Sequence, residues 1–194
     1  VLGSNGRLYS VPVAQLPGGR GDGQPVTTLI ELEAGTQIAH YFAGPLAAQL
    51  LLAGSGGYGF IASIEGMVSR NKGGKAFVSL GAEERLCPPT PVVGASHVCC
   101  ASVAGRILTF DIGELRQMDK GGRGLMLMAL EAGDSLVGAV PYTRSVRITG
   151  VGRGGKEREE QLEIRSLNNA RAVRGRKGKA ADWGFKPQVL QRVE

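Results

Sequence analysis

A pattern of about fifty residues occurs three times in this chain of 194 residues, and it restricts the possible folds more than any other feature of the sequence. Each occurrence contains two marker glycines. The first lies between two strand-like segments, at Gly6, Gly57 and Gly105. The second lies 17, 17 and 19 residues after the first, at Gly23, Gly74 and Gly124. Each of these second glycines belongs to a basic turn that runs into an apolar segment. Self-similarity at such a period is typical of solenoids, propellers and related repeat arrays.

Short runs of alternating apolar and polar residues, bounded by Gly, Asn, Asp or Pro, predict β-hairpins. These runs are RLYSVPV, LLLAGSGGYGFIASI, HVCCASVAGRILTFDI and SVRITGVGRGGKEREEQLEI. No window favours an amphipathic helix longer than about two turns. The segments AQLP, EGMV and GELRQM, which follow the first three hairpins, predict short turns or single helical turns. We therefore predict an all-β fold with about four strands per repeat, and propellers use four-stranded blades of this kind.

The three occurrences and a divergent fourth copy divide the chain into four repeats of a single domain. Their predicted bounds are 1–45, 46–93, 94–138 and 139–194. The fourth copy diverges most, because its turn GVGRGGKE is longer and its basic element RGRKGKA is followed by no clean strand pattern. Terminal repeats are often atypical, since they cap the array.

The distribution of charge points to an anionic partner. The formal net charge is +6, but residues 1–139 carry 10 basic and 11 acidic side chains, whereas residues 140–194 carry 13 basic and 6 acidic ones. Six basic residues and no acidic residue lie between Arg165 and Ala181. Nucleic acid is the usual partner of such a segment. No apolar run approaches the length needed to span a bilayer, so no membrane partner is predicted.

Motifs that suggest catalysis or ligand binding have simpler explanations here. GSGGYG fits a dinucleotide-binding pattern and GVGRGGKE nearly fits a phosphate loop, but the flanking residues of both predict hairpin turns. RGD at Arg20–Asp22 belongs to the repeated basic turn. Cys87, Cys99 and Cys100 form no C-x-x-C pair and are expected to be core residues of a protein in a reducing compartment. Because Cys99 and Cys100 are adjacent on a strand, they are expected to face opposite sides of the sheet.

The repeat resembles the C-terminal domains of the A subunits of bacterial type IIA topoisomerases. GRLYSVPVAQLPGGRGDGQPV, GGYGFIASIEGMVSRNKGGKAFVSL and AGRILTFDIGELRQMDKGGRG are similar to successive blades of the topoisomerase IV member of this family. The resemblance covers nearly the whole chain. It implies a β-pinwheel, a propeller-like fold of about four four-stranded blades that exchange strands with their neighbours, in a ring that is closed or broken. It also implies a first blade upstream of Val1.

The resemblance further implies a non-catalytic domain that binds and bends double-stranded DNA and tunes substrate choice for relaxation and decatenation. No cofactor is expected in this segment, because ATP and magnesium would act elsewhere in the enzyme. The implied partners are double-stranded DNA, the B subunit through the rest of the A subunit, and a second A subunit, in the bacterial cytoplasm. Gyrase is the alternative, but its wrapping motif Q-R-R-G-G-K-G is matched here only by the degenerate SRNKGGKA, which predicts weak wrapping. A propeller-like protein-interaction module is a third alternative, which the low aromatic content of 5% disfavours.

The candidate DNA-binding residues are the cations of the basic turns and of the basic segment in the fourth copy. A glycine turn lets the backbone approach a phosphate closely, and flanking Lys and Arg residues supply positive charge. Repeated once per blade, such turns would space basic patches around the rim of a disc. The predicted contacts are Arg20, Arg70, Lys72, Lys75, Lys120, Arg123, Arg171, Arg174, Arg176, Lys177 and Lys179. No catalytic residue and no metal site is predicted.

Overall fold

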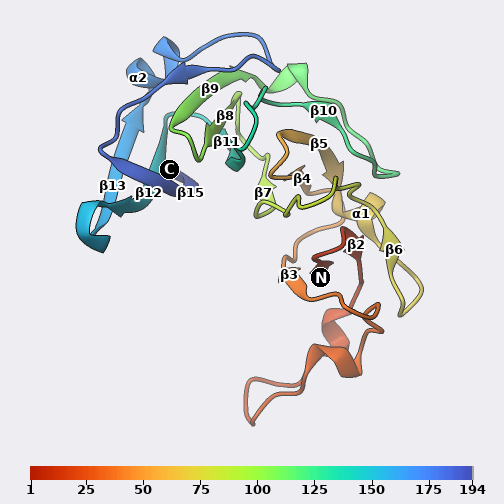
Figure 1. Ribbon diagram of the computed structural model, residues 1–194. Coiled ribbons are helices and arrows are strands. Elements are labelled where there is room, and N and C mark those ends of the chain that lie inside the picture. The colour runs from red at the N-terminus through yellow and green to blue at the C-terminus, as the bar shows by residue number, and fades with distance from the viewer. Residues whose placement is uncertain (194) are drawn as a thin grey trace.

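The computed structural model describes residues 1–193 and confirms the all-β, propeller-like fold. Four antiparallel sheets follow one another around an open arc, with the N-terminus at one end of the arc and the C-terminus in the sheet at the other end (Figure 1). Within the described residues, no helix is long and apolar enough to cross a membrane.

Each sheet is built around one hairpin, which in the first sheet spans Leu2–Leu8, so RLYSVPV supplies only its second strand. The first sheet has the strand order β3 (Ile38–His40), β1 (Leu2–Gly3), β2 (Arg7–Leu8), β6 (Lys75–Ala76). The second has the order β7 (Thr90–Pro91), β4 (Gln49–Ala53), β5 (Tyr58–Ser63), β10 (Leu125–Met126). The third has the order β11 (Leu136–Tyr142), β8 (His97–Ser102), β9 (Arg106–Asp111), β14 (Lys179–Ala180). The fourth has three described strands, β15 (Phe185–Val193), β12 (Ser145–Gly152) and β13 (Glu157–Glu163).

The last strand of each of the first three sheets comes from the following copy of the repeat. β6 leaves the second copy to pair with β2, β10 leaves the third copy to pair with β5, and β14 leaves the fourth copy to pair with β9. The opposite edge strands, β3, β7, β11 and β15, lie toward the inside of the arc, whereas β6 and β10 lie on its convex side (Figure 1). We call β6, β10 and β14 the donated strands.

The helical segments are short, as the sequence predicts. The segments AQLP, EGMV and GELRQM overlap η1 (Val13–Gln15), α1 (Ile64–Met67) and η3 (Ile112–Glu114), each of which begins one residue before its segment. The others are η2 (Val26–Thr28), η4 (Arg153–Gly155) and α2 (Ile164–Asn169). The side chain of Ser63 caps α1 by accepting a hydrogen bond from the backbone N–H of Gly66 at 3.1 Å.

Three apolar clusters hold neighbouring sheets together. One lies between the first and second sheets, one between the second and third, and one between the third and fourth. Cys100 belongs to the second of these clusters and Cys99 to the third, which confirms that the two thiols face opposite sides of β8. All three cysteines are buried and unpaired. Removal of apolar side chains from water therefore contributes to holding each sheet against the next.

The strand β15 corrects the expectation that no clean strand follows the basic element of the fourth copy. It spans nine residues and pairs with β12 along its length. The sequence pattern hides it because Pro187 interrupts the run. Pro187 lies opposite Gly150, where the pairing register shifts between Thr149 and Gly150. Proline lacks the N–H that a regular ladder requires, so it is tolerated in a strand at an irregularity of this kind.

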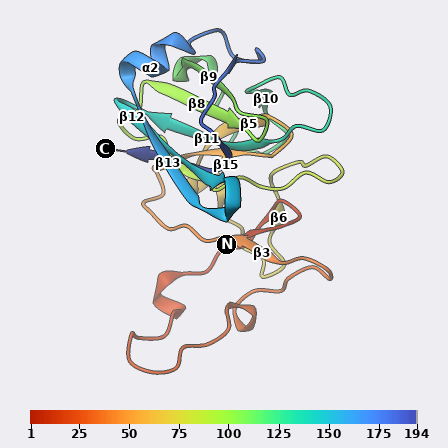
Figure 2. The same ribbon diagram turned by 60° about the vertical axis from the view of Figure 1, so that its left-hand side comes forward.

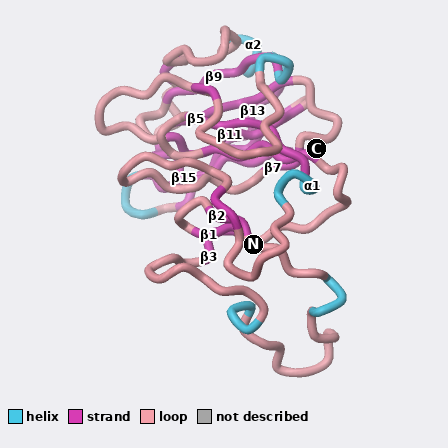
Figure 3. Tube along the Cα trace, turned by 90° about the vertical axis from the view of Figure 1, so that its right-hand side faces the viewer, coloured by secondary structure: helices cyan, strands magenta, loops and turns pink. Residues whose placement is uncertain are grey.

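Residues 12–29 form a loop that projects away from the sheets. Figures 2 and 3 show it extending beyond the first sheet, with η1 and η2 as its only helical turns. Residues 12–25 are all exposed. Unlike the later basic turns, the turn at Arg20–Gly23 pairs with no strand of the described residues.

Candidate nucleic-acid interface

Each donated strand fastens onto the hairpin of the preceding copy in the same way. The backbone N–H groups of Phe77 and Val78, which follow β6, donate to the carbonyl oxygen of Gly6 at 3.1 and 2.9 Å. The N–H of Leu127 donates to the carbonyl of Gly57 at 2.7 Å. The N–H of Ala181 donates to the carbonyl of Gly105 at 2.8 Å. The marker glycines of the hairpins are therefore the acceptors that the following copy binds.

The glycine that precedes each donated strand is required by the backbone. Gly74, Gly124 and Gly178 have φ angles of +64°, +83° and +70°, a region that residues with side chains rarely adopt. A Cβ at these positions would also collide with the carbonyl oxygens of Leu8, Gly59 and Ile107 respectively. Gly178 is therefore the equivalent, in the fourth copy, of the second marker glycine.

Two arginines that the sequence interpretation missed hold the basic turns in place. Arg7 donates from Nε and Nη2 to the carbonyl of Gly73 at 3.2 and 3.0 Å. Arg106 donates from Nη1 to the carbonyl of Gly178 at 3.1 Å. The sequence signal for these two arginines is the Gly-Arg pair that occurs in both of their hairpin turns. In the third such turn Tyr58 follows Gly57, and the guanidinium carbon of Arg123 lies 4.4 Å from the centroid of its ring.

Consecutive basic turns are hydrogen-bonded to one another. The N–H of Gly122 donates to the carbonyl of Phe77 at 2.7 Å, and the N–H of Ser79 donates to the carbonyl of Gly122 at 3.0 Å. The N–H of Gly175 donates to the carbonyl of Leu127 at 2.8 Å. We call the resulting surface, residues 69–80, 119–130 and 171–181, the convex band.

The convex band concentrates the positive charge of the chain. It contains ten Lys and Arg residues and a single acidic residue, Asp119, which gives a formal charge of +9. The whole chain carries +6, so the remaining residues carry −3. The carboxylate of Asp119 accepts hydrogen bonds from the backbone N–H and hydroxyl of Ser63 at 2.8 and 2.9 Å, and this bonding lowers its pKa. The one acidic group of the band is thus bound to the start of α1.

The predicted contact residues divide into two groups. In the first group the side chain is exposed and makes no hydrogen bond or ion pair within residues 1–193. Its members are Arg20, Arg70, Lys72, Lys120, Arg176 and Lys179. All but Arg20 belong to the convex band, whereas Arg20 lies in the projecting loop at residues 12–29.

In the second group the side chain has a partner in the fold. Lys75 donates from Nζ to the carbonyl of Gly66 at 2.6 Å, and Arg123 pairs with Glu84 at 2.6 Å. In the fourth copy, Arg174 donates a hydrogen bond to the backbone carbonyl of Met126 at 2.5 Å. Lys177 and Arg171 form longer ion pairs, with Glu131 at 3.4 Å and with Asp111 at 3.9 Å respectively. A phosphate would have to compete with these partners, which it need not do in the first group.

Four antiparallel sheets that exchange edge strands around an arc define a propeller-like β domain, here with a basic convex edge. Comparison with known proteins agrees with this class. A family model described as DNA gyrase C-terminal domain, beta-propeller, matches residues 96–142. The chain is 39% identical over 181 residues to the A subunit of DNA topoisomerase 4 from Neisseria gonorrhoeae, covering 90% of this chain and 23% of that protein. It is 31% identical over 180 residues to the corresponding protein of Escherichia coli K12, covering 90% of this chain and 24% of that protein.

Solved structures lead to the same family. The C-terminal domain of Escherichia coli ParC superimposes with a TM-score of 0.86 at 27% identity, covering 98% of this chain and 78% of that one. A DNA gyrase A C-terminal domain superimposes with a TM-score of 0.73 at 19% identity, covering 100% of this chain and 64% of that one, a likeness of fold. In sequence and fold the chain resembles the C-terminal domains carried by the A subunits of topoisomerase 4 and gyrase. It spans about a quarter of the length of the curated relatives it matches.

Proposed function

We propose that this domain binds double-stranded DNA along the convex band. The observation that carries the proposal is the concentration of +9 in three hydrogen-bonded basic turns of a chain whose other residues sum to −3. Five cations of the band are exposed and have no partner within residues 1–193, and they are Arg70, Lys72, Lys120, Arg176 and Lys179. Such a surface attracts the phosphate backbone without regard to sequence.

The proposed contact is to phosphates because the band offers little that could read bases. It is built from glycine turns and two-residue strands, and no helix or long ribbon projects from its described residues that could enter a major groove. The band also follows the convex side of the arc (Figure 1), so a duplex that contacts all three turns bends around the domain. Bending lets more phosphates reach the cations, which offsets the elastic cost of deforming the DNA.

A salt-dependent titration with two matched variants tests this proposal. R70A/K72A/K120A removes three cations of the convex band, and R144A/K156A/R158A removes three exposed cations outside it. Log affinity for a duplex of arbitrary sequence should fall linearly with log salt, and the band variant should lower the slope by about 2 to 3, at roughly 0.9 per phosphate contact. The control variant should keep most of the slope. Equal losses in both variants would contradict a localised interface.

We infer that binding bends DNA without wrapping it tightly. The second basic turn, Arg70–Ala76, has Asn71, Lys72 and Ala76 where the gyrase wrapping motif has Arg, Arg and Gly. Ligation of a nicked circle in the presence of the domain should therefore trap little writhe. Trapping as much writhe as a gyrase A C-terminal domain would favour the gyrase-type function instead.

In the intact protein, we propose that this domain acts as the non-catalytic DNA-binding part of the A subunit in a bacterial type II topoisomerase. Its partners would be an ATP-hydrolysing B subunit together with a second A subunit, in the cytoplasm. By holding DNA on a bent path, it would favour some duplex crossings over others for relaxation and decatenation. The resemblance to topoisomerase 4 A subunits and the basic convex band support this role.

A further inference from the structure

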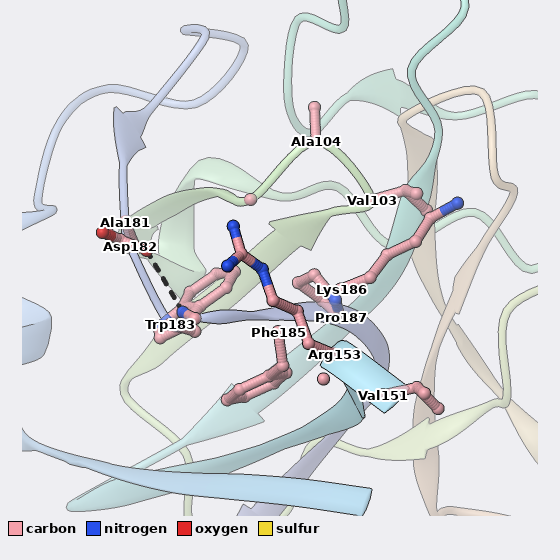
Figure 4. A pocket seen from close by; sticks show the side chains of 13 residues that line it. Val103, Ala104, Val151, Arg153, Ala181, Asp182, Trp183, Phe185, Lys186 and Pro187 are labelled. Atoms are coloured by element: carbon pink, nitrogen blue, oxygen red, sulfur yellow. Dashed lines mark hydrogen bonds between the residues drawn. The ribbon is translucent and has the colours of Figure 1, made fainter. Parts of the chain in front are cut away.

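A groove at the end of the convex band, sharing only Ala181 with it, lies between the third and fourth sheets. It has a volume of about 620 Å³ and is lined by the β8–β9 turn at Val103–Gly105, the β12–β13 turn at Val151–Arg153, and the segment 181–187 that leads into β15. Figure 4 shows the residues that line it. It is the larger of two grooves that share Trp183.

The wall of the groove is aromatic in a chain with few aromatic residues. Trp183 is the only tryptophan of the sequence, and its ring stacks on that of Phe185 with centroids 6.3 Å apart and planes 28° apart. Both rings are half-buried against the apolar cluster between the third and fourth sheets. Trp183 also lines a smaller groove of about 240 Å³ between β14 and α2. The indole of Trp183 therefore packs against the apolar cluster and also lines both grooves.

The charged side chains of the groove favour an anion. Arg153 and Lys186 are exposed and make no hydrogen bond or ion pair within residues 1–193. In Figure 4 Arg153 extends in the direction of Trp183, and Lys186 extends toward Val103 on the other side. Asp182 is the one acidic residue of the lining, and it accepts a hydrogen bond from the N–H of Gly184 at 3.1 Å, within its own turn. The lining keeps a net charge of +1.

We propose that this groove binds an unpaired nucleotide of single-stranded DNA, with the base on the aromatic wall and the flanking phosphates at Arg153 and Lys186. An aromatic platform beside cations is the arrangement that holds single strands, since every base offers a face for stacking. Bases of an intact duplex are stacked on each other and do not offer that face. The site extends the proposed DNA binding, on which it rests, to a second form of DNA at an adjoining surface.

Trp183 makes the proposal directly measurable, because it is the sole tryptophan. An oligothymidylate of about 12 nucleotides should quench its fluorescence, whereas a duplex of equal length and free thymidine monophosphate at equal nucleotide concentration should not. The variant R153A/K186A removes only exposed side chains. It should weaken binding of the same oligothymidylate, now carrying a fluorescent label, roughly tenfold. W183L should weaken it by a similar factor, since stacking on one base is commonly worth about that much.

The band variant R70A/K72A/K120A separates this proposal from the function proposed above. It should lose duplex affinity and retain quenching by oligothymidylate. Absence of quenching by oligothymidylate, or unchanged affinity in R153A/K186A, would overturn the groove site while leaving duplex binding intact. Equal quenching by thymidine monophosphate would overturn the assignment to a single strand. Loss of quenching in the band variant would show that single strands bind at the convex band instead.

Discussion

Arg123 and Glu84 join two copies of the repeat through an ion pair of 2.6 Å between Nη2 and Oε1. Glu84 is mostly buried, with 15% of its side chain exposed, and its other oxygen accepts from the N–H of Gly81 at 2.8 Å. The guanidinium of Arg123 also lies 4.4 Å above the ring of Tyr58. Arg123 therefore belongs to the joint between the second sheet and the strand donated to it, even though it sits in a basic turn.

Replacement of Arg123 should affect stability more than DNA binding. R123A leaves the carboxylate of Glu84 half-satisfied in a mostly buried position, which should lower the free energy of unfolding by about 1–2 kcal/mol. Lys120, in the same turn, is exposed and without a partner in the described residues, so K120A should leave stability within about 0.5 kcal/mol of the parent and weaken duplex binding. Urea unfolding and a binding titration of both variants measure the two effects. The reverse pattern would contradict this division of roles.

Gly73 and Gly74 provide an internal comparison for the strand exchange. Gly74 has a φ of +64° and would place a Cβ against the carbonyl of Leu8, whereas a Cβ on Gly73 meets nothing within 4 Å. G74A should lower the free energy of unfolding by about 2 kcal/mol or more, because β6 must shift away from β2. G73A should change it by less than about 1 kcal/mol. Thermal unfolding distinguishes the pair, and similar midpoints for both variants would argue against a required close approach at Gly74.

The sequence predicted the parts of the fold that depend on local chemistry. The hairpins around Gly57 and Gly105, the single helical turns after them and the two faces of Cys99 and Cys100 follow from periodicity and turn residues. Strand exchange between copies was implied only by the family resemblance. Two-residue strands such as β6 and β10 carry no periodic signal, and they exist because a hairpin of the preceding copy offers them an open edge.

The candidate site was predictable at the level of segments and less so at the level of side chains. The basic turns at Lys72 and Lys120 do lie together on one surface. Which cations are free depends on contacts between residues distant in the sequence, such as Arg123 with Glu84 and Arg7 with the carbonyl of Gly73. β15 was missed because Pro187 breaks its pattern at a register shift that only the pairing with β12 reveals.

The buried thiols predict a loss of stability at alkaline pH. Burial raises the pKa of the Cys87 thiol to about 12, against a smaller opposing effect from Arg85, and burial raises the pKa of Tyr142 to about 12 as well. The folded state therefore holds these protons more tightly than the unfolded chain. The contribution of each buried thiol to the free energy of unfolding is complete below the unfolded thiol pKa of about 8.5. It falls by about 1.4 kcal/mol per pH unit as pH rises from there toward 12.

Urea unfolding at about pH 8 and about pH 10 tests this dependence. The parent should lose more stability between the two conditions than C87A does, by about 1–2 kcal/mol, since the variant lacks one of the titrating groups. The comparison uses the difference between two pH values, so the cost of the cavity in C87A cancels. An identical pH dependence in both proteins would show that Cys87 ionises as readily in the folded protein as in the unfolded one.

The central claim is that duplex DNA lies on the convex band, and cleavage from a reagent tethered at a single engineered cysteine tests it most directly. Burial raises the thiol pKa values of the native cysteines, so a new exposed cysteine reacts selectively. N71C places an iron–EDTA group on the band, and A39C places it on β3, at the opposite edge of the same sheet. Both positions are exposed. We predict strand cleavage of bound duplex from position 71 and little from position 39; stronger cleavage from position 39 would contradict binding at the convex band.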